Sequence, residues 1–162
     1  MKTLTAYFSA EGRTAKAAAL VAKETESELF EIKPVEPYSE SDINWKNPLA
    51  RCNREKIGKK DVAIESAVVD FAAYDVIFLG FPIWYYGAPN IVQTFCKTYD
   101  WSGKKLCIFA TSGGSEIGRT AEKLSPYIEG AKIIGAKVLK NTEGLKAWVA
   151  EMKEALAGEA EE

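Results

Sequence analysis

The sequence contains no histidine among its 162 residues. This absence excludes Ser-His and Cys-His nucleophile pairs, histidine metal sites and general acids that titrate as an imidazole. If the chain is an enzyme, a bound cofactor is the simplest source of its chemistry. We therefore predict no catalytic side chain and no metal ligand.

Other features are scarce. The three cysteines include no C-x-x-C pair, which fits a reducing cytoplasm better than a disulfide framework. The net charge of −2 gives no sign of binding to nucleic acid or to an anionic membrane. The longest apolar run, residues 76–86, is too short to span a bilayer, and Lys2 leads directly into a short strand rather than a signal peptide. We expect a cytoplasmic protein.

Hydrophobic residues make up 47% of the sequence, which is enough for the core of one domain. Segments typical of strands and helices alternate along the chain. We expect strands at 4–8, 29–33, 76–81, 106–110 and 132–138, the last broken at Gly135, and helices at 14–23, 91–99, 116–127 and 145–156. This alternation predicts a doubly wound α/β domain, a three-layer sandwich around a mostly parallel sheet.

The segment 34–60 interrupts the alternation with three prolines and a run of charged residues. A long, weakly structured segment inside a compact domain is usually functional or disordered, and a lid over a ligand is one interpretation. A short helix is expected over 51–56. The domain is predicted to cover residues 1–158, followed by a short acidic tail at 159–162, and residues 158–162 are expected to fray.

Residues 9–14, SAEGRT, join the first strand to the first helix. One interpretation is a helix N-cap formed by Ser9 or Thr14. The other is an anion site, because free amide groups collect at a helix N-terminus, Gly12 permits a close approach, and Arg13 adds positive charge. The pattern matches neither the dinucleotide motif nor the nucleoside-triphosphate motif.

Two more loops change the balance. Residues 81–90, FPIWYYGAPN, follow the most apolar strand, and their three consecutive aromatic residues suit a flat ligand, with a core patch as the alternative. Residues 111–115, TSGGS, follow the next strand and form a tight turn with exposed amides, with a helix start capped by Ser115 as the alternative. All three loops follow carboxyl ends of parallel strands, where open α/β sheets bind ligands. Together they predict a ligand with one phosphate and a planar heterocycle, namely flavin mononucleotide (FMN).

Two long strings, DVIFLGFPIWYYGAPNIVQTF and YDWSGKKLCIFATSGGSEIG, closely resemble sequences of the flavodoxin family. The resemblance runs from about Thr3 to Val138. It implies a five-stranded parallel sheet in the order 2-1-3-4-5, an order that is taken from flavodoxin itself as the standard example of the fold, with FMN at the switch point.

The resemblance also places the FMN-binding residues in the three loops. They are Ser9, Glu11, Gly12, Arg13 and Thr14 in the phosphate loop; Pro82, Ile83, Trp84, Tyr85, Tyr86 and Gly87 in the first flavin-ring loop; and Thr111, Ser112, Gly113 and Gly114 in the second, with Glu116 and Gly118 beside it. The family's phosphate loop commonly reads S-x-T-G-N-T. Glu11 therefore stands in the place of a threonine and Arg13 in that of an asparagine, so that one hydroxyl donor is lost and one charge of each sign is added.

By the same resemblance, the 34–60 segment is expected to border the exposed edge of the flavin. Tyr38, Trp45, Arg51 and Arg54 would then shape a shallow mouth for a small acceptor or a partner protein. The alternative for the two arginines is that they are ordinary solvated charges on a short helix.

The function implied by the resemblance is electron transfer through a non-covalent FMN, to a redox partner protein or a small-molecule electron acceptor. Electron-carrier flavodoxins are typically strongly acidic, whereas this chain is nearly balanced in charge. An electron carrier and a small NAD(P)H-dependent FMN oxidoreductase of the quinone- or nitro-reducing kind therefore both stay open. A non-redox binding module with a degenerate flavin site is a third alternative. A phospho-receiver or phosphatase-like protein ranks last, because the loops lack an acidic cluster.

Overall fold

Five strands form one parallel sheet in the order β2-β1-β3-β4-β5, as predicted. The structure is a computed structural model that describes residues 1–58, 61–84, 87–112, 120–139 and 142–161. The strands are β1 (Thr3–Tyr7), β2 (Glu28–Glu31), β3 (Val76–Pro82), β4 (Lys105–Thr111) and β5 (Lys132–Leu139). Each strand prediction therefore holds to within about two residues at either end. β3 and β4 are buried over nearly their whole length, which explains their continuous apolar sequences.

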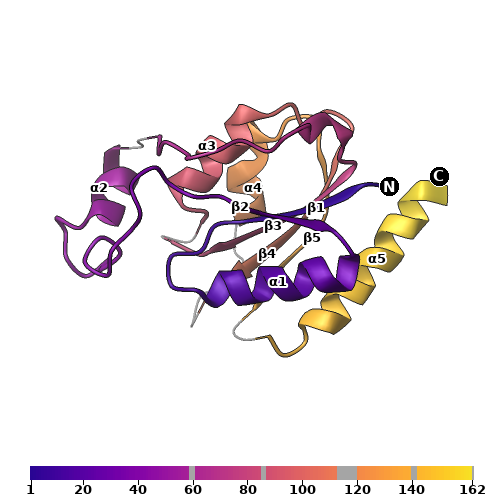
Figure 1. Cartoon of the computed structure of the whole chain (residues 1–162), viewed down its shortest axis with the longest axis horizontal. Coiled ribbons are helices and arrows are strands. Elements are labelled where there is room, and N and C mark those ends of the chain that lie inside the picture. The colour runs from indigo at the N-terminus through magenta and orange to yellow at the C-terminus, as the bar shows by residue number, and fades with distance from the viewer. Residues whose placement is uncertain (59–60, 85–86, 113–119, 140–141, 162) are drawn as a thin grey trace.

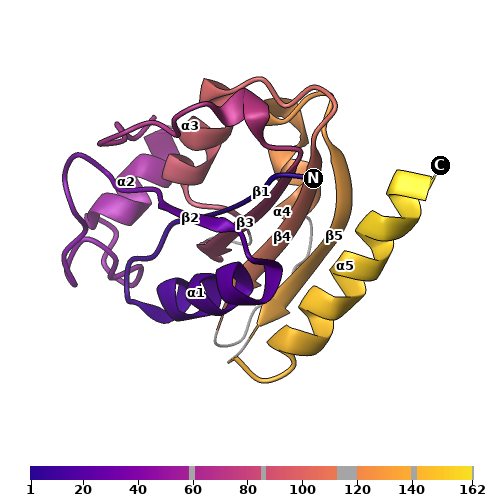
Figure 2. The same ribbon diagram turned by 45° about the vertical axis from the view of Figure 1, so that its right-hand side comes forward.

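Helices cover both faces of the sheet. They are α1 (Arg13–Thr25), α2 (Arg51–Gly58), α3 (Asn90–Thr98), α4 (Thr120–Leu124) and α5 (Leu145–Glu161), with short 3₁₀ helices at Phe71–Ala73 and Ser125–Tyr127. Figures 1 and 2 show α1 and α5 on one face of the sheet and α3 and α4 on the other. The α2 region lies at the end of the molecule opposite the two chain termini, where the parallel strands end.

Two helix predictions need correction. The helix expected over 116–127 ends at Leu124 and continues as a 3₁₀ turn, because Pro126 lacks the amide donor that an α-helix requires; residues 116–119 lie outside the described part. The expected fraying of 158–162 is wrong for most of that stretch, since α5 runs to Glu161. An ion pair from Lys132 Nζ to Glu159 Oε2, at 2.6 Å, ties the last turns of α5 to β5.

The predicted break in the last strand is a bulge instead. Leu106 pairs with Ile133 and Cys107 with Gly135, so that one residue of β5 is left out of the ladder while the strand continues. A Cβ atom at Gly135 would lie 2.7 Å from Met152 Sδ on α5. The glycine therefore allows the helix to pack closely at this point.

Gly80 on β3 has a tighter constraint. It pairs with Phe109 on β4, and a Cβ atom at Gly80 would lie 2.2 Å from the Phe109 ring. The ring is fully buried, and Trp148 of α5 lies against it with a centroid distance of 6.2 Å. Only glycine fits beneath the ring at this position.

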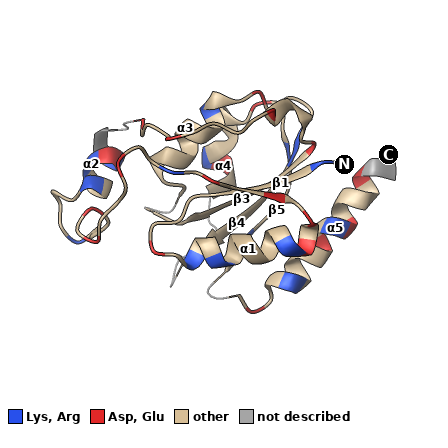
Figure 3. Ribbon diagram, in the orientation of Figure 1, with Lys and Arg blue, Asp and Glu red and all other residues tan. Residues whose placement is uncertain are grey.

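The surface carries both signs of charge in mixture. Figure 3 shows Lys and Arg interspersed with Asp and Glu over the helices, rather than separated into an acidic and a basic side. All three cysteines are free and buried. Among the described residues, no helix combines the length and apolar character needed to cross a membrane, and no group of three or more His, Cys, Asp and Glu side chains could hold a metal ion.

Candidate functional site at the carboxyl end of the sheet

The loop after β1 is shaped by Gly12. Gly12 is the N-cap of α1 and has a left-handed backbone, with φ at 92°, and no side chain caps the helix. The prediction that Ser9 or Thr14 caps α1 is therefore wrong. Ser9 Oγ instead accepts a hydrogen bond from the Gly12 amide at 3.0 Å, which closes the turn before the helix begins. Glycine is suited to this position because other residues seldom adopt a positive φ.

The same loop faces outward. Glu11, Gly12 and Arg13 are exposed, and a Cβ atom at Gly12 would meet none of the described atoms within 4 Å. Lys16 donates the first helical hydrogen bond, to the Gly12 carbonyl at 3.2 Å, so the amides of residues 13–15 stand at the open N-terminus of α1. No acidic residue lies in the first turn of α1. The loop therefore offers amide donors and open space, which fit a single phosphate.

Thr14 links this loop to the loop after β4. Its side-chain oxygen lies 2.7 Å from Thr111 Oγ1, and both residues are buried, Thr14 with only 2% of its surface exposed. A hydroxyl has one hydrogen to give. When Thr111 donates that bond, the hydrogen of Thr14 stays available for another acceptor. The sequence predicts both threonines at the site, but no pattern in it indicates that the two side chains bond to each other.

The loop after β3 is held by three backbone hydrogen bonds. The Ile83 amide donates to the Thr111 carbonyl at 3.0 Å, which joins the first flavin-ring loop to the second. Trp84 and Gly87 exchange hydrogen bonds in both directions, at 2.9 and 3.1 Å, and so form an isolated antiparallel bridge. Of the predicted loop residues, Pro82 and Ile83 thus lie directly beside Thr111, and Trp84 and Gly87 form the turn that follows them.

Trp84 belongs to an aromatic cluster with Phe8 and Tyr38. The Trp84 ring meets the Phe8 ring edge-on at a centroid distance of 5.6 Å and the Tyr38 ring at 5.4 Å. Phe8 and Tyr38 also meet edge-on, at 5.7 Å. Trp84 remains half-buried, so it is neither a fully enclosed core residue nor a free surface side chain.

Tyr38 comes from the 34–60 segment, and a polar network fixes it there. Its hydroxyl donates to Glu55 Oε1 at 2.5 Å, and Arg51 Nε donates to Glu55 Oε2 at 3.2 Å. The Arg51 guanidinium also lies 4.0 Å from the centroid of the Tyr38 ring and donates to the Glu36 carbonyl at 2.8 Å. Burial raises the pKa of Tyr38, and its hydrogen bond to Glu55 raises that pKa further.

This network bears on the alternative that Arg51 and Arg54 are ordinary solvated charges on a short helix. Arg51 is not an ordinary solvated charge, because its side chain is only 15% exposed and has several partners. Arg54 is exposed, as that alternative expected. The 34–60 segment does reach the first ring loop, through the contact of Tyr38 with Trp84. Trp45, in the same segment, is 67% exposed.

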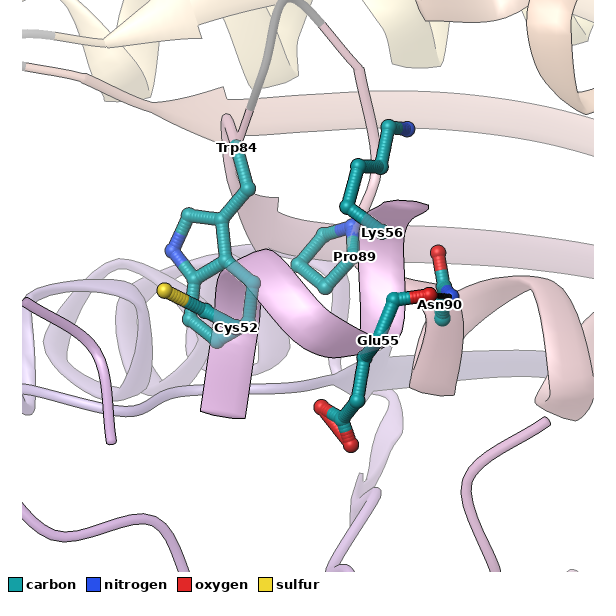
Figure 4. A pocket seen from close by; sticks show the side chains of 6 residues that line it. All are labelled: Cys52, Glu55, Lys56, Trp84, Pro89 and Asn90. Carbon is teal, nitrogen blue, oxygen red and sulfur yellow. Dashed lines mark hydrogen bonds between the residues drawn. The ribbon is translucent and has the colours of Figure 1, made fainter. Parts of the chain in front are cut away.

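A small pocket lies where the 34–60 segment meets the loop after β3 (Figure 4). Its lining residues are Cys52, Glu55, Lys56, Trp84, Pro89 and Asn90. Asn90 Nδ2 donates to the Glu55 carbonyl at 2.7 Å and thereby connects α3 to α2. All six lie in segments that the sequence placed near the ligand, residues 34–60 and 81–90, but only Trp84 was predicted as a cofactor-binding residue. The Pro-Asn pair at the start of a helix was the one signal that could have pointed to Asn90.

The structure therefore brings together Ser9, Gly12, Thr14, Trp84 and Thr111 at one end of the sheet. Ser112 follows β4 at the same end, and its amide donates to the Leu139 carbonyl at 3.3 Å. The other predicted site residues lie outside the described part of the chain: Tyr85, Tyr86, Gly113, Gly114, Glu116 and Gly118.

The strand order and these strand-end loops define a flavodoxin-like α/β protein. The sequence profile described as Flavodoxin matches residues 2–152, and the chain belongs to the flavodoxin family. No curated protein sequence matches the chain.

Several solved structures are similar over nearly the whole chain. A protein from Bacteroides uniformis assigned as a flavoprotein is 38% identical, with 92% of this chain and 97% of that chain covered and a TM-score of 0.86. Another from Bacteroides eggerthii is 35% identical, with 94% and 98% covered and a TM-score of 0.85. A flavoprotein from Lactobacillus acidophilus, solved in complex with FMN, is 25% identical, with 91% and 97% covered and a TM-score of 0.67.

Proposed function

We propose that this protein binds FMN non-covalently at the carboxyl end of its sheet and transfers electrons through it. The observation that carries the proposal is the linkage of the three loops through Thr111. Its hydroxyl bonds to Thr14 of the phosphate loop, and its carbonyl accepts from Ile83 of the first ring loop. The similar Lactobacillus acidophilus protein, solved with FMN, supports the same ligand.

The described residues fit the two ends of such a ligand. The open turn at Gly12 and the amides at the start of α1 would hold the phosphate, with the Thr14 hydroxyl as a further donor. The half-buried Trp84, fixed edge-on by Phe8 and Tyr38, would give the planar ring an apolar side and keep water from it. When bound, FMN supplies the redox chemistry, so the chain needs no titrating imidazole.

A second function, a small FMN-dependent oxidoreductase, is favoured by the distribution of charge. Carriers that dock by charge steering present a surface of one sign to their partner. Here basic and acidic residues are mixed over the helices (Figure 3) and the net charge is only −2. A small-molecule electron donor or acceptor agrees better with this surface than a strongly basic protein partner does.

The proposal is tested by the flavin itself. We expect the purified protein to be yellow. Denaturation should release FMN rather than FAD, because the loop at Gly12 fits a single phosphate group. The colourless apoprotein should recover the flavin spectrum with added FMN. Recovery of FAD, or no binding in the presence of excess FMN, would overturn the proposal. Anaerobic titration with NADH and NADPH then separates the oxidoreductase from the carrier.

A further inference from the structure

The loop after β3 is attached to the 34–60 segment at both of its ends. At the start of the loop, the Trp84 ring meets the Tyr38 ring edge-on at a centroid distance of 5.4 Å. At the end of the loop, Asn90 Nδ2 donates to the backbone carbonyl of Glu55 at 2.7 Å. Glu55 takes part in both attachments, because its carboxylate oxygen Oε1 accepts from the Tyr38 hydroxyl at 2.5 Å. Figure 4 shows that this carboxylate points away from Asn90, so the two attachments leave opposite sides of the residue.

Arg51 holds Tyr38 from a second direction. Its guanidinium lies 4.0 Å from the centroid of the Tyr38 ring, and its Nε donates to Glu55 Oε2 at 3.2 Å. The guanidinium also donates to the carbonyls of Glu36 and Pro37, at 2.8 and 3.3 Å, which holds the backbone just before Tyr38. The Arg51 and Glu55 side chains are only 15% and 13% exposed, so salt and water screen this ion pair little.

Two rings meet the half-buried Trp84 side chain, and they are held in different ways. Phe8, directly after β1, is 1% exposed and meets the Trp84 ring edge-on at 5.6 Å, so the packed core holds it. Tyr38 comes from the 34–60 segment, and its position depends on the polar contacts described above. A change at Tyr38 or at Glu55 therefore reaches Trp84 without altering the sheet.

We propose that Tyr38 is a positioning residue that fixes Trp84 against the flavin ring, with Glu55 as its anchor. The 34–60 segment then supports the wall of the flavin site instead of opening and closing over it as a lid. The inference rests on the proposed function, because a fixed Trp84 ring serves binding only when a planar ligand lies against it. An apolar ring held close to FMN excludes water and makes negative charge on the reduced flavin costly, which lowers its midpoint potential.

The positioning role is tested first in the apoprotein, without any flavin. The indole N–H signal of Trp84, assigned by its loss in Trp84→Ala, reports by NMR relaxation how firmly the ring is held. We expect an order parameter of about 0.85 in the wild type and below about 0.6 in Tyr38→Leu, because the edge contact is removed. An unchanged order parameter in Tyr38→Leu would overturn the proposal.

The matched control is Tyr127→Leu. Tyr127 is a half-buried tyrosine with Lys97 Nζ 5.3 Å from its ring centroid, in the turn that leads into the amino end of β5. Its replacement should lower the free energy of unfolding while the Trp84 order parameter, the FMN affinity and the midpoint potential stay at their wild-type values. A loss of Trp84 order in this control as well would show a general loosening of the chain and contradict a specific role for Tyr38.

Milder variants test the anchor and replace Tyr38→Leu if that variant does not fold. Tyr38→Phe keeps the ring but cannot donate to Glu55, so the Trp84 order parameter should fall part of the way. Glu55→Leu removes the acceptor of the same hydrogen bond and should match Tyr38→Phe. Glu55→Gln keeps an oxygen that accepts from Tyr38 and should retain the wild-type value. Full Trp84 order in both Tyr38→Phe and Glu55→Leu would show that Glu55 is not the anchor.

The effect on FMN is measured with a double-mutant cycle. Tyr38→Leu should weaken FMN about tenfold, the upper range for an aromatic pair contact, and should raise the midpoint potential as water reaches the ring. In the Trp84→Ala background the same substitution should change the FMN dissociation constant by less than about twofold, because Tyr38 acts through Trp84. The measurements are fluorescence titration with FMN and a spectroscopic redox titration.

The cycle also separates this inference from the proposed function. An equal loss of FMN affinity on Tyr38→Leu in both backgrounds would overturn the inference, since Tyr38 would then act on the flavin without Trp84. Failure of the wild type to bind FMN would contradict the proposed function alone. The indole measurement on the apoprotein would still decide whether Tyr38 positions Trp84.

Discussion

The two ends of the sheet treat their polar groups in opposite ways. At the amino end, the buried Lys104, with 6% of its surface exposed, donates to the carbonyls of Phe71 at 3.1 Å and Tyr74 at 2.5 Å. At the carboxyl end, Glu11, Gly12 and Arg13 face outward. The first end buries a charged side chain that is bonded within the chain, whereas the second places the turn at Gly12 on the surface. Together with the proposed function, the difference predicts that variants at the amino end change stability and variants at the carboxyl end change ligand binding.

The sharpest contrast is between two tryptophans. Trp101 at the amino end is 2% exposed and donates to the Cys96 carbonyl at 2.8 Å, so Trp101→Ala should lower the free energy of unfolding by about 3–5 kcal/mol. Trp84→Ala at the carboxyl end should cost less stability but weaken FMN binding roughly thirtyfold, about 2 kcal/mol. Urea unfolding of the apoprotein and FMN titration measure the two effects.

If Trp101→Ala does not fold, Trp101→Phe provides a milder variant with the same expected pattern, a loss of stability with FMN affinity retained. A loss of stability without any change in FMN affinity in Trp84→Ala would make Trp84 a packing residue and remove the contrast.

Lys104 gives the next largest effect. Lys104→Met keeps the aliphatic stem but removes the charged donor, so the buried carbonyls that it serves lose their partner. Each such group costs about 1–3 kcal/mol, and we expect a total loss of about 3 kcal/mol. FMN affinity should stay within twofold of the wild type. The control is Lys105→Met at the neighbouring, partly exposed position, and an equal loss in both variants would contradict a specific role for Lys104.

At the carboxyl end, the Thr14–Thr111 pair separates ligand binding from loop closure. Thr14→Ala and Ser9→Ala should each weaken FMN by roughly 1.5–3 kcal/mol, the value of a hydrogen bond to a charged acceptor, and leave riboflavin binding nearly unchanged. Thr111→Val removes the same internal bond but keeps the Thr14 hydroxyl, so it should affect FMN less. Fluorescence titration with both flavins measures this. Equal losses for FMN and riboflavin would show that the hydroxyls serve only the fold.

The smallest effect is a dependence on pH at the amino end. The hydrogen bond that Tyr74 donates to Glu28 raises the pKa of Tyr74 to about 12. The tyrosine then keeps its proton in the folded chain after the unfolded chain loses it, so its stabilising contribution is complete below pH 10 and is lost between pH 10 and 12. Tyr74→Phe should therefore lose less stability than the wild type over this range, by about 1 kcal/mol at most, as measured by urea unfolding. Parallel pH profiles would contradict it.

Much of the fold follows from local patterns in the sequence. The apolar runs of β3 and β4 and the alternation of strands with helices are enough to predict the sheet. The same alternation predicts that the loop over residues 9–14 joins β1 to α1. Pro126 is the sequence signal that α4 ends before residue 127, which the helix expected over 116–127 does not take into account. The bulge in β5 lies next to Gly135, which packs closely against Met152 of α5, and no local pattern in the sequence predicts that contact.

The candidate site was predictable in its loops and not in its connections. Ser9, Gly12 and Trp84 stand where the sequence placed them, but the capping role of Gly12 depends on a backbone angle that residue type alone does not fix. The contact of Tyr38 with Trp84 and the hydrogen bond from Asn90 to the Glu55 carbonyl join residues far apart in the sequence. Such pairings arise because the 34–60 segment lies at the carboxyl end of the sheet, beside the loop after β3, and the local sequence pattern does not predict them.

The Gly80–Phe109 pair has a consequence for how this family diverges. The two positions share the space of a single large side chain, because any Cβ at residue 80 would enter the ring of residue 109. A substitution that adds a side chain at position 80 requires a smaller residue at position 109 beforehand. Without it, the core is overpacked and the protein is destabilised. We therefore expect positions 80 and 109 to change together among related sequences. A larger residue at position 80 on β3 should occur with a smaller residue at position 109 on β4.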